Sequence, residues 1–241
     1  MKLEIGSDHA FEIRRESIPS ECRESFTVLF LSDLHLNKHG RNNSMRISET
    51  IGALNPTIIL FGGDYADSSR GLNHLNDLLR SISGRKNVFA IAGNHDYRLG
   101  IDRIKKVMQE NNVAWIEEMS HKLKIGDTTV GIDGNRWSSE GKNADVSILV
   151  LHKPRHADGF KNSYDLALAG HLHGGQIVLW RSGFRLFPGR LFYRWNILKE
   201  KFDNCLYLIS KGLGDTLPIR YNCRRDMVFV EVIGNKQTQK T

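Results

Sequence analysis

The sequence predicts an α/β (α+β) fold in which two β-sheets pack together and helices lie outside them. Short runs rich in Val, Ile, Leu and Phe recur along the 241 residues, and segments with helical spacing separate the early runs. Strands and helices therefore alternate in the first half of the chain, whereas the second half consists mostly of strands and loops.

The apolar runs are expected to be strands of sheets that are covered on both faces. They span residues 27–34, 57–61, 88–92, 128–132, 146–151, 164–169, 205–210 and 227–233. Helical spacing covers residues 44–54, 72–82 and 102–111, and Asp102 is a candidate N-cap for the last of these helices. We expect one domain over residues 1–241, with a polar lead-in at 1–25 that has room for one strand and a flexible tail at 235–241.

The composition favours a soluble protein with anionic partners. The chain has 34 basic and 27 acidic residues, a net charge of +7, which suits phosphorylated metabolites, nucleic acid or acidic lipid surfaces. No apolar run is long enough for a membrane span, and charges throughout the first 25 residues exclude a secretory signal. Three cysteines without a Cys-x-x-Cys pattern favour neither a disulfide framework nor a zinc ribbon. We therefore expect a cytoplasmic protein, with peripheral contact to a membrane as the alternative and no indication of the oligomeric state.

Polar side chains with metal-binding chemistry follow the predicted strands at the points where these end. They are, in chain order, Asp33, His35, Asp64, Asn94, His95, Asp96, His152, His171 and His173. The i, i+2 spacing within SDLH and within GHLH points the two side chains of each pair to the same side of a strand. Because ligands bind at the carboxyl ends of strands in α/β sheets, we expect these groups to converge in one crevice.

The motifs SDLH, GGDYAD, GNHD, VLHKP and GHLH together resemble the motif set of the calcineurin-like metallophosphoesterases, over about residues 26–233. The resemblance implies a four-layer αββα sandwich, in which two mixed β-sheets are flanked by helices and two divalent metal ions lie at the strand ends. Carried over to this sequence, one metal ion would be held by Asp33, His35, Asp64 and His173. The other would be held by Asp64, Asn94, His152 and His171, with Asp64 as the bridging ligand.

Such a centre suits a phosphate ester. Two divalent ions bring more charge than two ligand carboxylates cancel, so an anion is attracted. Imidazole and carboxylate ligands favour manganese, iron or zinc, and manganese is our first expectation. The mechanism implied is in-line attack on phosphorus by a metal-activated hydroxide.

The GNHD motif supplies the candidate catalytic residues. His95 is the candidate general acid, and Asp96 would orient His95 and favour its protonated form, unless Asp96 is a turn or cap residue. Asp67 is expected to support its loop more than to bind metal. Glycines flank the candidate ligands, among them Gly93 and Gly170, where the missing side chain permits close approach of the backbone to a phosphate.

The strings GHLHGGQ, VLHKP and KGLGDTLPIRYNCRRD resemble a bacterial branch of this family that includes membrane-associated members and UDP-2,3-diacylglucosamine pyrophosphatase-like members of lipid A biosynthesis. We therefore expect a pyrophosphohydrolase or phosphoesterase whose substrate is a lipid-linked or nucleotide-sugar phosphoanhydride such as UDP-2,3-diacylglucosamine. A nuclease or nucleotide phosphodiesterase is the alternative, to which the positive charge also points. A non-catalytic metal-binding scaffold is disfavoured, because every ligand position is filled.

Residues 177–199 interleave aromatic side chains with arginines and contain no acidic residue. This pattern suits a membrane interface, an acyl-bearing phosphate substrate or a nucleic acid strand. Candidate substrate contacts in this segment are Arg181, Arg185, Arg190 and Trp180. The alternative is that the aromatic side chains pack a long loop over the sheet.

Overall fold

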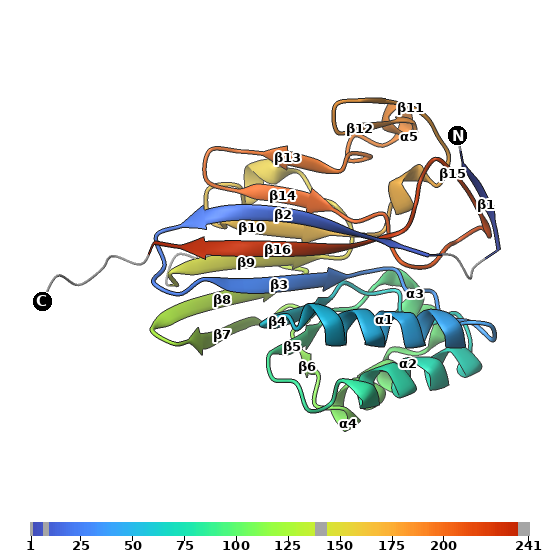
Figure 1. The fold of residues 1–241 in the computed structure, drawn as a ribbon, viewed down its shortest axis with the longest axis horizontal. Coiled ribbons are helices and arrows are strands. Elements are labelled where there is room, and N and C mark those ends of the chain that lie inside the picture. Colours follow the sequence, from blue (N-terminus) through green and yellow to red (C-terminus); the bar gives the residue numbers. More distant parts are fainter. Residues whose placement is uncertain (1, 7–9, 138–143, 236–241) are drawn as a thin grey trace, which may run out of the picture.

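Two six-stranded β-sheets pack face to face in the computed structural model, which describes residues 2–6, 10–137 and 144–235 (Figure 1). The predicted tail lies outside the described residues, apart from residue 235. The mixed α/β fold with sheets flanked by helices is confirmed.

The first sheet is mixed and brings β2, near the start of the chain, beside the last strand, β16. Its order is β2 (Glu12–Ser20), β16 (Asp226–Gly234), β3 (Phe26–Leu31), β4 (Ile58–Phe61), β5 (Val88–Ala90) and β6 (Ala114–Trp115). Strand β16 is parallel to β2 and antiparallel to β3, and β3 to β6 are parallel to one another. The carboxyl ends of β3, β4 and β5 therefore meet at one edge.

The second sheet is also mixed, with a parallel centre. Its order is β13 (Lys199–Lys201), β14 (Leu206–Ile209), β10 (Leu166–Ala169), β9 (Val146–Leu151), β8 (Thr128–Gly134) and β7 (Ser120–Ile125). The outer strands β13 and β7 are antiparallel to their neighbours, whereas β14, β10, β9 and β8 are parallel.

Helices cover the outer face of the first sheet. They are α1 (Arg41–Leu54), α2 (Ser69–Ser81), α3 (Asn94–Leu99) and α4 (Ile101–Glu110). Along β3, Val28 and Phe30 pack between the sheets and Leu29 and Leu31 pack with helix residues, so all four of these successive positions are apolar. The outer face of the second sheet is covered by the short η2 (Ala157–Gly159) and by loop residues such as Trp195, so this fourth layer is thin.

Two expectations about local structure are corrected. Asp102 lies in the first turn of α4 and does not cap it, because the chain enters this helix directly from α3 through Gly100, whose φ is 109°. The lead-in contains two strands, β1 (Leu3–Ile5) and β2. Strand β2 was hidden because charged residues, Glu12, Arg14 and Glu16, occupy its partly buried positions while Ile13 is exposed, which is tolerated at a sheet edge.

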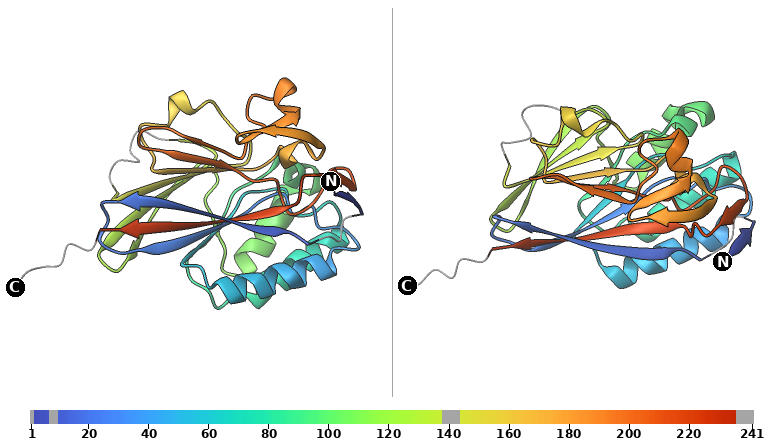
Figure 2. Two further views of the ribbon diagram at one scale, coloured as in Figure 1. Left: turned by 45° about the horizontal axis from the view of Figure 1, so that its top comes forward. Right: turned by 90° about the horizontal axis from the view of Figure 1, so that it is seen from above.

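A small hairpin with a short helix projects from the sandwich. It comprises β11 (Val178–Ser182), β12 (Arg185–Pro188) and α5 (Gly189–Phe192), and it follows η3 (His173–Gly175). Figure 2 shows it at the same end as the pair formed by β1 and β15 (Ile219–Tyr221). Among the described residues, no helix has both the length and the apolar character needed to cross a membrane.

Candidate metal centre

The candidate ligands lie just beyond the strand ends, and five of the seven are in left-handed backbone. Strand β3 ends at Leu31, three residues earlier than expected, so strand alternation does not set the directions of Asp33 and His35. The residues with positive φ are Asp33 (53°), His35 (42°), Asp64 (56°), His171 (73°) and His173 (49°). Such conformations are uncommon outside glycine, and their concentration here marks a site that the surrounding fold holds under strain.

The seven candidate ligands meet at the end of the sandwich in two adjacent clusters. One cluster contains Asp33, His35 and His173, and the other contains Asp64, His152 and His171, with the ligand atoms of each within 4.8 Å of one another. Asp64 connects the clusters, because its Oδ2 lies 3.7 Å from Nε2 of His35 and 3.3 Å from Nε2 of His152. Asn94 completes the second cluster, with its Oδ1 3.0 Å from Nε2 of His152.

Backbone N–H groups orient both carboxylates. The N–H of His171 donates to both carboxylate oxygens of Asp33, at 3.0 and 2.9 Å. The N–H of His95 donates to Oδ1 of Asp64 at 2.7 Å, which leaves Oδ2 directed at the two histidines. A Cβ on Gly93 would lie 2.2 Å from Oδ1 of Asp64. The glycine therefore makes room for a carboxylate, not for a phosphate as the sequence suggested.

The histidine tautomers fit metal coordination through Nε2. Nδ1 of His152 lies 2.9 Å from the carbonyl oxygen of Gly62 and therefore carries the hydrogen in the neutral ring. Its Nε2 then directs a lone pair at Oδ2 of Asp64, at Oδ1 of Asn94 and at Nδ1 of His171, which lies 3.2 Å away. A cation among these atoms would satisfy lone pairs that otherwise face one another.

His35 repeats the same arrangement. Its Nδ1 lies 3.0 Å from Oδ1 of Asp67, and its Nε2 is buried without a hydrogen-bond partner. A buried ring nitrogen without a partner costs free energy, and a metal ion bound beside Asp33 would remove that cost. The donor atoms present therefore fit a divalent cation in each cluster.

The electrostatics divide the histidines into two kinds. Burial alone would lower the pKa of His152, but its hydrogen bond to Asp64 and the charges of Asp33 and Asp64 raise it to about 9. Burial lowers the pKa of His171 to about 4, aided by the charge of His152, and burial also lowers the pKa of His173 to about 4. The imidazoles of His171 and His173 are thus already neutral near pH 7. At His152, by contrast, a proton competes with a metal ion for Nε2.

His95 lies at the rim of the clusters and is held by Asp67. Its ring is 4.7 Å from that of His35 in an edge-to-face contact, and its side chain is 24% exposed. Oδ1 of Asp67 lies 3.2 Å from Nδ1 of His95 as well as 3.0 Å from Nδ1 of His35. These three residues also form a compact group of possible ligands, but the Nδ1 atoms of both rings already contact Oδ1 of Asp67.

Asp96 does not orient His95, and that expectation is corrected. Its buried carboxylate turns back to the start of α3 and accepts hydrogen bonds from the N–H groups of Gly93, Asp64 and Tyr65, at 2.7 to 2.9 Å. Burial raises the pKa of Asp96 to about 6. The structure shows the alternative role for Asp96, that of a helix cap, and this cap also joins the loops after β4 and β5. The carboxylate that contacts the His95 ring is that of Asp67.

Asn135 and Glu117 support the site, and the sequence analysis missed them. Oδ1 of Asn135 accepts from the N–H of His152 at 2.7 Å, and Nδ2 of Asn135 donates to Glu117. Glu117 also accepts from the N–H of Ala92 at 2.6 Å. Asn135 directly follows β8, so the strand-end criterion used for the other residues could have found it. Glu117 carries no comparable signal.

Arg220 approaches the site from a distant segment. It is fully buried, and its Nη2 lies 3.4 Å from Nδ1 of His173 while donating to the carbonyl oxygens of Lys211 and Gly214. It also pairs with Asp215 at 2.5 Å. No local motif marks this arginine as a neighbour of His173.

A cavity of about 230 Å³ opens beside Asn94 and His152. Its lining includes Tyr97, Lys153 and Arg155. The predicted substrate contacts Arg181, Arg185, Arg190 and Trp180 lie instead on β11, β12 and α5. As substrate contacts they stay a prediction.

Comparison with known proteins identifies relatives of this chain. Residues 26–175 match the family model described as calcineurin-like phosphoesterase. The uncharacterized metallophosphoesterase YkoQ of Bacillus subtilis (strain 168) is 28% identical over 243 residues, covering 91% of this chain and 87% of its own length. Phosphodiesterase YaeI of Escherichia coli (strain K12) is 27% identical over 224 residues, covering 86% and 82%.

Solved structures support the fold. A putative 5'-nucleotidase from Staphylococcus aureus aligns with a TM-score of 0.52 and 13% identity, over 90% of this chain and 56% of that one. The calcineurin-like phosphoesterase YfkN from Bacillus subtilis aligns with a TM-score of 0.51 and 12% identity, over 79% and 82%. At these identities the likeness concerns the fold alone.

Proposed function

The chain belongs to the calcineurin-like phosphoesterase family and is a metal-dependent phosphoester hydrolase, and from this premise we propose that a two-ion centre in it hydrolyses phosphodiesters or phosphoanhydrides. One ion would be held by Asp33, His35, Asp64 and His173, and the other by Asp64, Asn94, His152 and His171. The observation that carries this assignment is the place of Asp64, whose Oδ2 faces a histidine of each cluster. Imidazole and carboxylate ligands favour manganese, with iron or zinc as alternatives.

The protein's own groups have separate tasks in this proposal. Divalent ions bound at the clusters would supply a Lewis acid that activates water and withdraws charge from the phosphoryl oxygens. The contact between His95 Nδ1 and Asp67 leaves Nε2 of His95 free, and this atom donates the proton to the leaving oxygen. Asp67 keeps the ring in place, and Asp96 fixes the loops that present Asp64 and Asn94.

The cavity beside the second cluster supports a substrate with more than one charged or bulky group on phosphorus. Lys153 and Arg155 bring positive charge to its wall, and the ring of Tyr97 is 58% exposed there. A second phosphate or an esterified group would be received by these side chains. We therefore place a lipid-linked or nucleotide-sugar phosphoanhydride first, with UDP-2,3-diacylglucosamine and a role in lipid A biosynthesis as the specific case. The relative YaeI is a phosphodiesterase, which agrees with diester hydrolysis.

A nuclease or nucleotide phosphodiesterase is the second candidate, favoured by the net charge of +7. The two are separated by assaying manganese-, iron- and zinc-loaded protein against bis-p-nitrophenyl phosphate, UDP-2,3-diacylglucosamine, cyclic nucleotides and single-stranded DNA. Preference for the anhydride supports the first candidate, and preference for DNA with a steep salt dependence supports the second. Fully metal-loaded protein that turns over none of them would contradict both and indicate a binding scaffold.

A further inference from the structure

The projecting hairpin and α5 expose an unusual number of apolar side chains. In the described part of the chain, 16 large apolar side chains are exposed, and seven of them fall within residues 177–193. On the hairpin they are Ile177, Leu179, Trp180 and Phe184. On α5 and just after it, Leu191, Phe192 and Tyr193 are 68%, 76% and 61% exposed. Residues 177–194 are called the hairpin surface below.

The exposed side chains are additional to a small apolar cluster that attaches the hairpin to the rest of the protein. Val178 and Leu186 anchor the hairpin by packing against Cys223, so one apolar face of the hairpin is already buried. On another face, the Trp180 ring stacks on Phe187 at 5.1 Å while Trp180 stays 50% exposed. The interpretation that the aromatic residues pack a long loop over the sheet therefore holds for Trp195, which is buried. It fails for the exposed aromatic residues Trp180, Phe184, Phe192 and Tyr193.

Uncompensated positive charge lies among the apolar side chains. Residues 177–199 contain no Asp or Glu. Within the described part of the chain, Arg181, Arg185, Arg190 and Arg194 form no ion pair with a carboxylate. The exposed groups of the hairpin surface therefore combine apolar area with a net positive charge.

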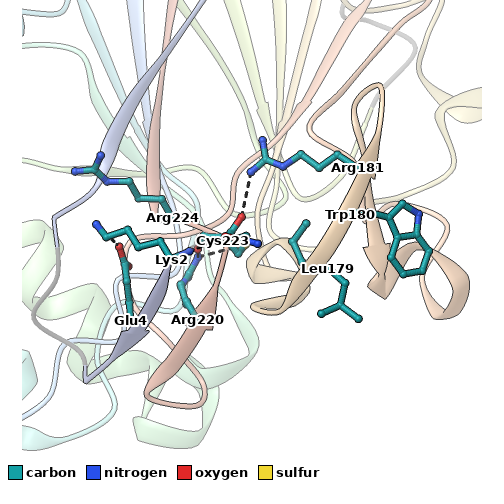
Figure 3. Close-up of a pocket in the computed structure, with 10 residues that line it drawn as sticks. Lys2, Glu4, Leu179, Trp180, Arg181, Arg220, Cys223 and Arg224 are labelled. Carbon is teal, nitrogen blue, oxygen red and sulfur yellow. Dashed lines mark hydrogen bonds and ion pairs between the residues drawn. The ribbon is translucent and has the colours of Figure 1, made fainter.

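A basic cavity adjoins this surface. It has a volume of about 400 Å³, and Figure 3 shows Arg181 from the hairpin, Lys2 from just before β1 and Arg224 from the loop between β15 and β16 around it. Glu4 pairs with Lys2 at 3.0 Å, so Arg181 and Arg224 supply the excess charge. Nη2 of Arg181 donates to the carbonyl oxygen of Asn222 at 3.2 Å, which holds this guanidinium at the cavity.

We propose that the hairpin surface docks the protein on an anionic lipid bilayer. Aromatic side chains prefer the level of the lipid head groups, and arginines among apolar side chains contact the lipid phosphates. A protein interface instead concentrates its apolar side chains in a centre that is depleted of charge. Here every exposed apolar side chain lies within a few residues of an arginine, which favours the bilayer.

Docking in this way places the metal centre next to the membrane. The hairpin begins three residues after η3, which contains His173, and a Cβ on Gly175 in η3 would lie 3.6 Å from the Cα of Gly189 in α5. The bilayer would thus lie beside the loops that hold the candidate ligands. The inference goes beyond the proposed function and does not depend on which phosphate ester is cleaved.

Sedimentation of the full chain with vesicles tests the role of charge. We expect binding to vesicles that contain phosphatidylglycerol and little binding to pure phosphatidylcholine. The double variant Arg181→Gln/Arg185→Gln should bind the anionic vesicles about 25-fold more weakly, at roughly fivefold for each arginine. The matched control Lys122→Gln/Lys124→Gln removes the same charge from exposed positions on β7 and should change binding less than threefold.

A second pair of variants tests the apolar contribution. Leu191→Ser/Phe192→Ser should weaken binding at least tenfold, whereas Met119→Ser/Ile233→Ser, at exposed positions away from the hairpin, should not. Turnover of water-soluble bis-p-nitrophenyl phosphate and the unfolding temperature should be unchanged in Leu191→Ser/Phe192→Ser, so a loss of binding is separate from a loss of fold or of the proposed activity.

Three results would overturn the inference. One is equal binding to phosphatidylcholine and phosphatidylglycerol, and another is an equal loss in the hairpin variants and their controls. The third is light scattering that shows a dimer abolished by Leu191→Ser/Phe192→Ser, which would assign the surface to a second copy of the chain.

Discussion

Oδ1 of Asp67 lies 3.2 Å from Nδ1 of His95, so the carboxylate that holds the candidate general acid comes from the loop after β4 and not from the neighbouring Asp96. The same oxygen is 3.0 Å from Nδ1 of His35, a candidate metal ligand. One side chain thereby sets the ring orientation both of a ligand and of a proton donor. Its removal is expected to affect chemistry more than substrate binding.

The variant Asp67→Asn should lower kcat about 10-fold to 100-fold, as loss of a supporting carboxylate at a metal site commonly does, with little change in KM. Metal content is measured on the same sample. A loss of metal would report the contact of Asp67 with the ligand His35, and a lower kcat with full metal content would report its contact with His95. Asp77→Asn, on the exposed face of α2, changes charge equally and should be without effect. Unchanged kcat in Asp67→Asn would show that the carboxylate is dispensable.

Replacing His95 by Ala should lower kcat about 10²-fold to 10⁴-fold, the usual contribution of a general acid, while both ions stay bound. The loss should be larger for an alkyl phosphodiester, whose leaving oxygen needs the proton, than for bis-p-nitrophenyl phosphate. Steady-state kinetics on the two substrates measure this difference. An equal loss on both would assign His95 to transition-state binding without proton transfer.

The seven candidate ligands could be selected from the sequence because each lies within four residues after the end of an apolar strand, and their binding of metal stays a prediction. The left-handed backbone that aims Asp33 and His35 was not predictable, since it depends on contacts with the loops after β4 and β10. The exchange of roles between Asp96 and Asp67 has the same origin. Asp96, at the third position of α3, turns back to the start of the helix. The sequence does not show which loop will supply the carboxylate that contacts the neighbouring His95.

The layers of the fold were predicted from apolar periodicity, and the errors lie where periodicity is weak. Strand β2 places charged residues at its partly buried positions at a sheet edge, and the hairpin exposes apolar side chains that normally indicate burial. Arg220 approaches His173 across 47 residues of chain, and no local pattern reports such a contact.

Metal binding should strengthen with pH through the titration of His152. In the metal-free protein its pKa is raised to about 9, so near pH 7 an ion must displace a proton, whereas His171 and His173 are already neutral. The apparent affinity of the second cluster should rise about tenfold for each pH unit from 7 to 9. Competition with a chelator at several pH values, together with proton release in weakly buffered solution, measures it. A flat profile would contradict the raised pKa of His152.

The same shift predicts how the metal-free fold responds to pH. Because the pKa of His152 is raised above its ordinary value of 6.5, this group stabilises the metal-free fold fully below pH 6.5. That stabilisation is lost as the pH rises from 6.5 to 9. The unfolding temperature of chelator-treated protein should therefore fall over this interval, and the fall should shrink in His152→Gln.

The two clusters predict a change in metal stoichiometry. His171→Ala or Asn94→Ala removes a ligand of the second cluster alone, so the protein should retain one ion of two and lose nearly all turnover. His39→Ala, at an exposed position outside both clusters, should keep both ions. Elemental analysis after dialysis gives the count. Two tightly bound ions and full activity in His171→Ala would contradict the assignment.

Gly170 and Gly52 form a matched pair that tests the packing of the centre. A Cβ on Gly170 would lie 2.0 Å from Oγ of Ser32 and 2.4 Å from Oδ2 of Asp33, both fully buried, so Gly170→Ala must displace the carboxylate. We expect the free energy of unfolding to fall by about 1–3 kcal/mol, as for other overpacked sites, and the first cluster to lose its ion.

A Cβ on Gly52 in α1 would meet no atom within 4 Å, and Gly52→Ala should raise the free energy of unfolding by about 0.5–1 kcal/mol through helix propensity. Neither position has a positive φ, so neither substitution forces an alanine into left-handed backbone, and the difference in the space around the added Cβ dominates the comparison. Denaturant unfolding with metal analysis measures both quantities. Unchanged metal content and stability in Gly170→Ala would show that Asp33 has room to move. Close packing against Gly170 would then not be what orients the Asp33 carboxylate.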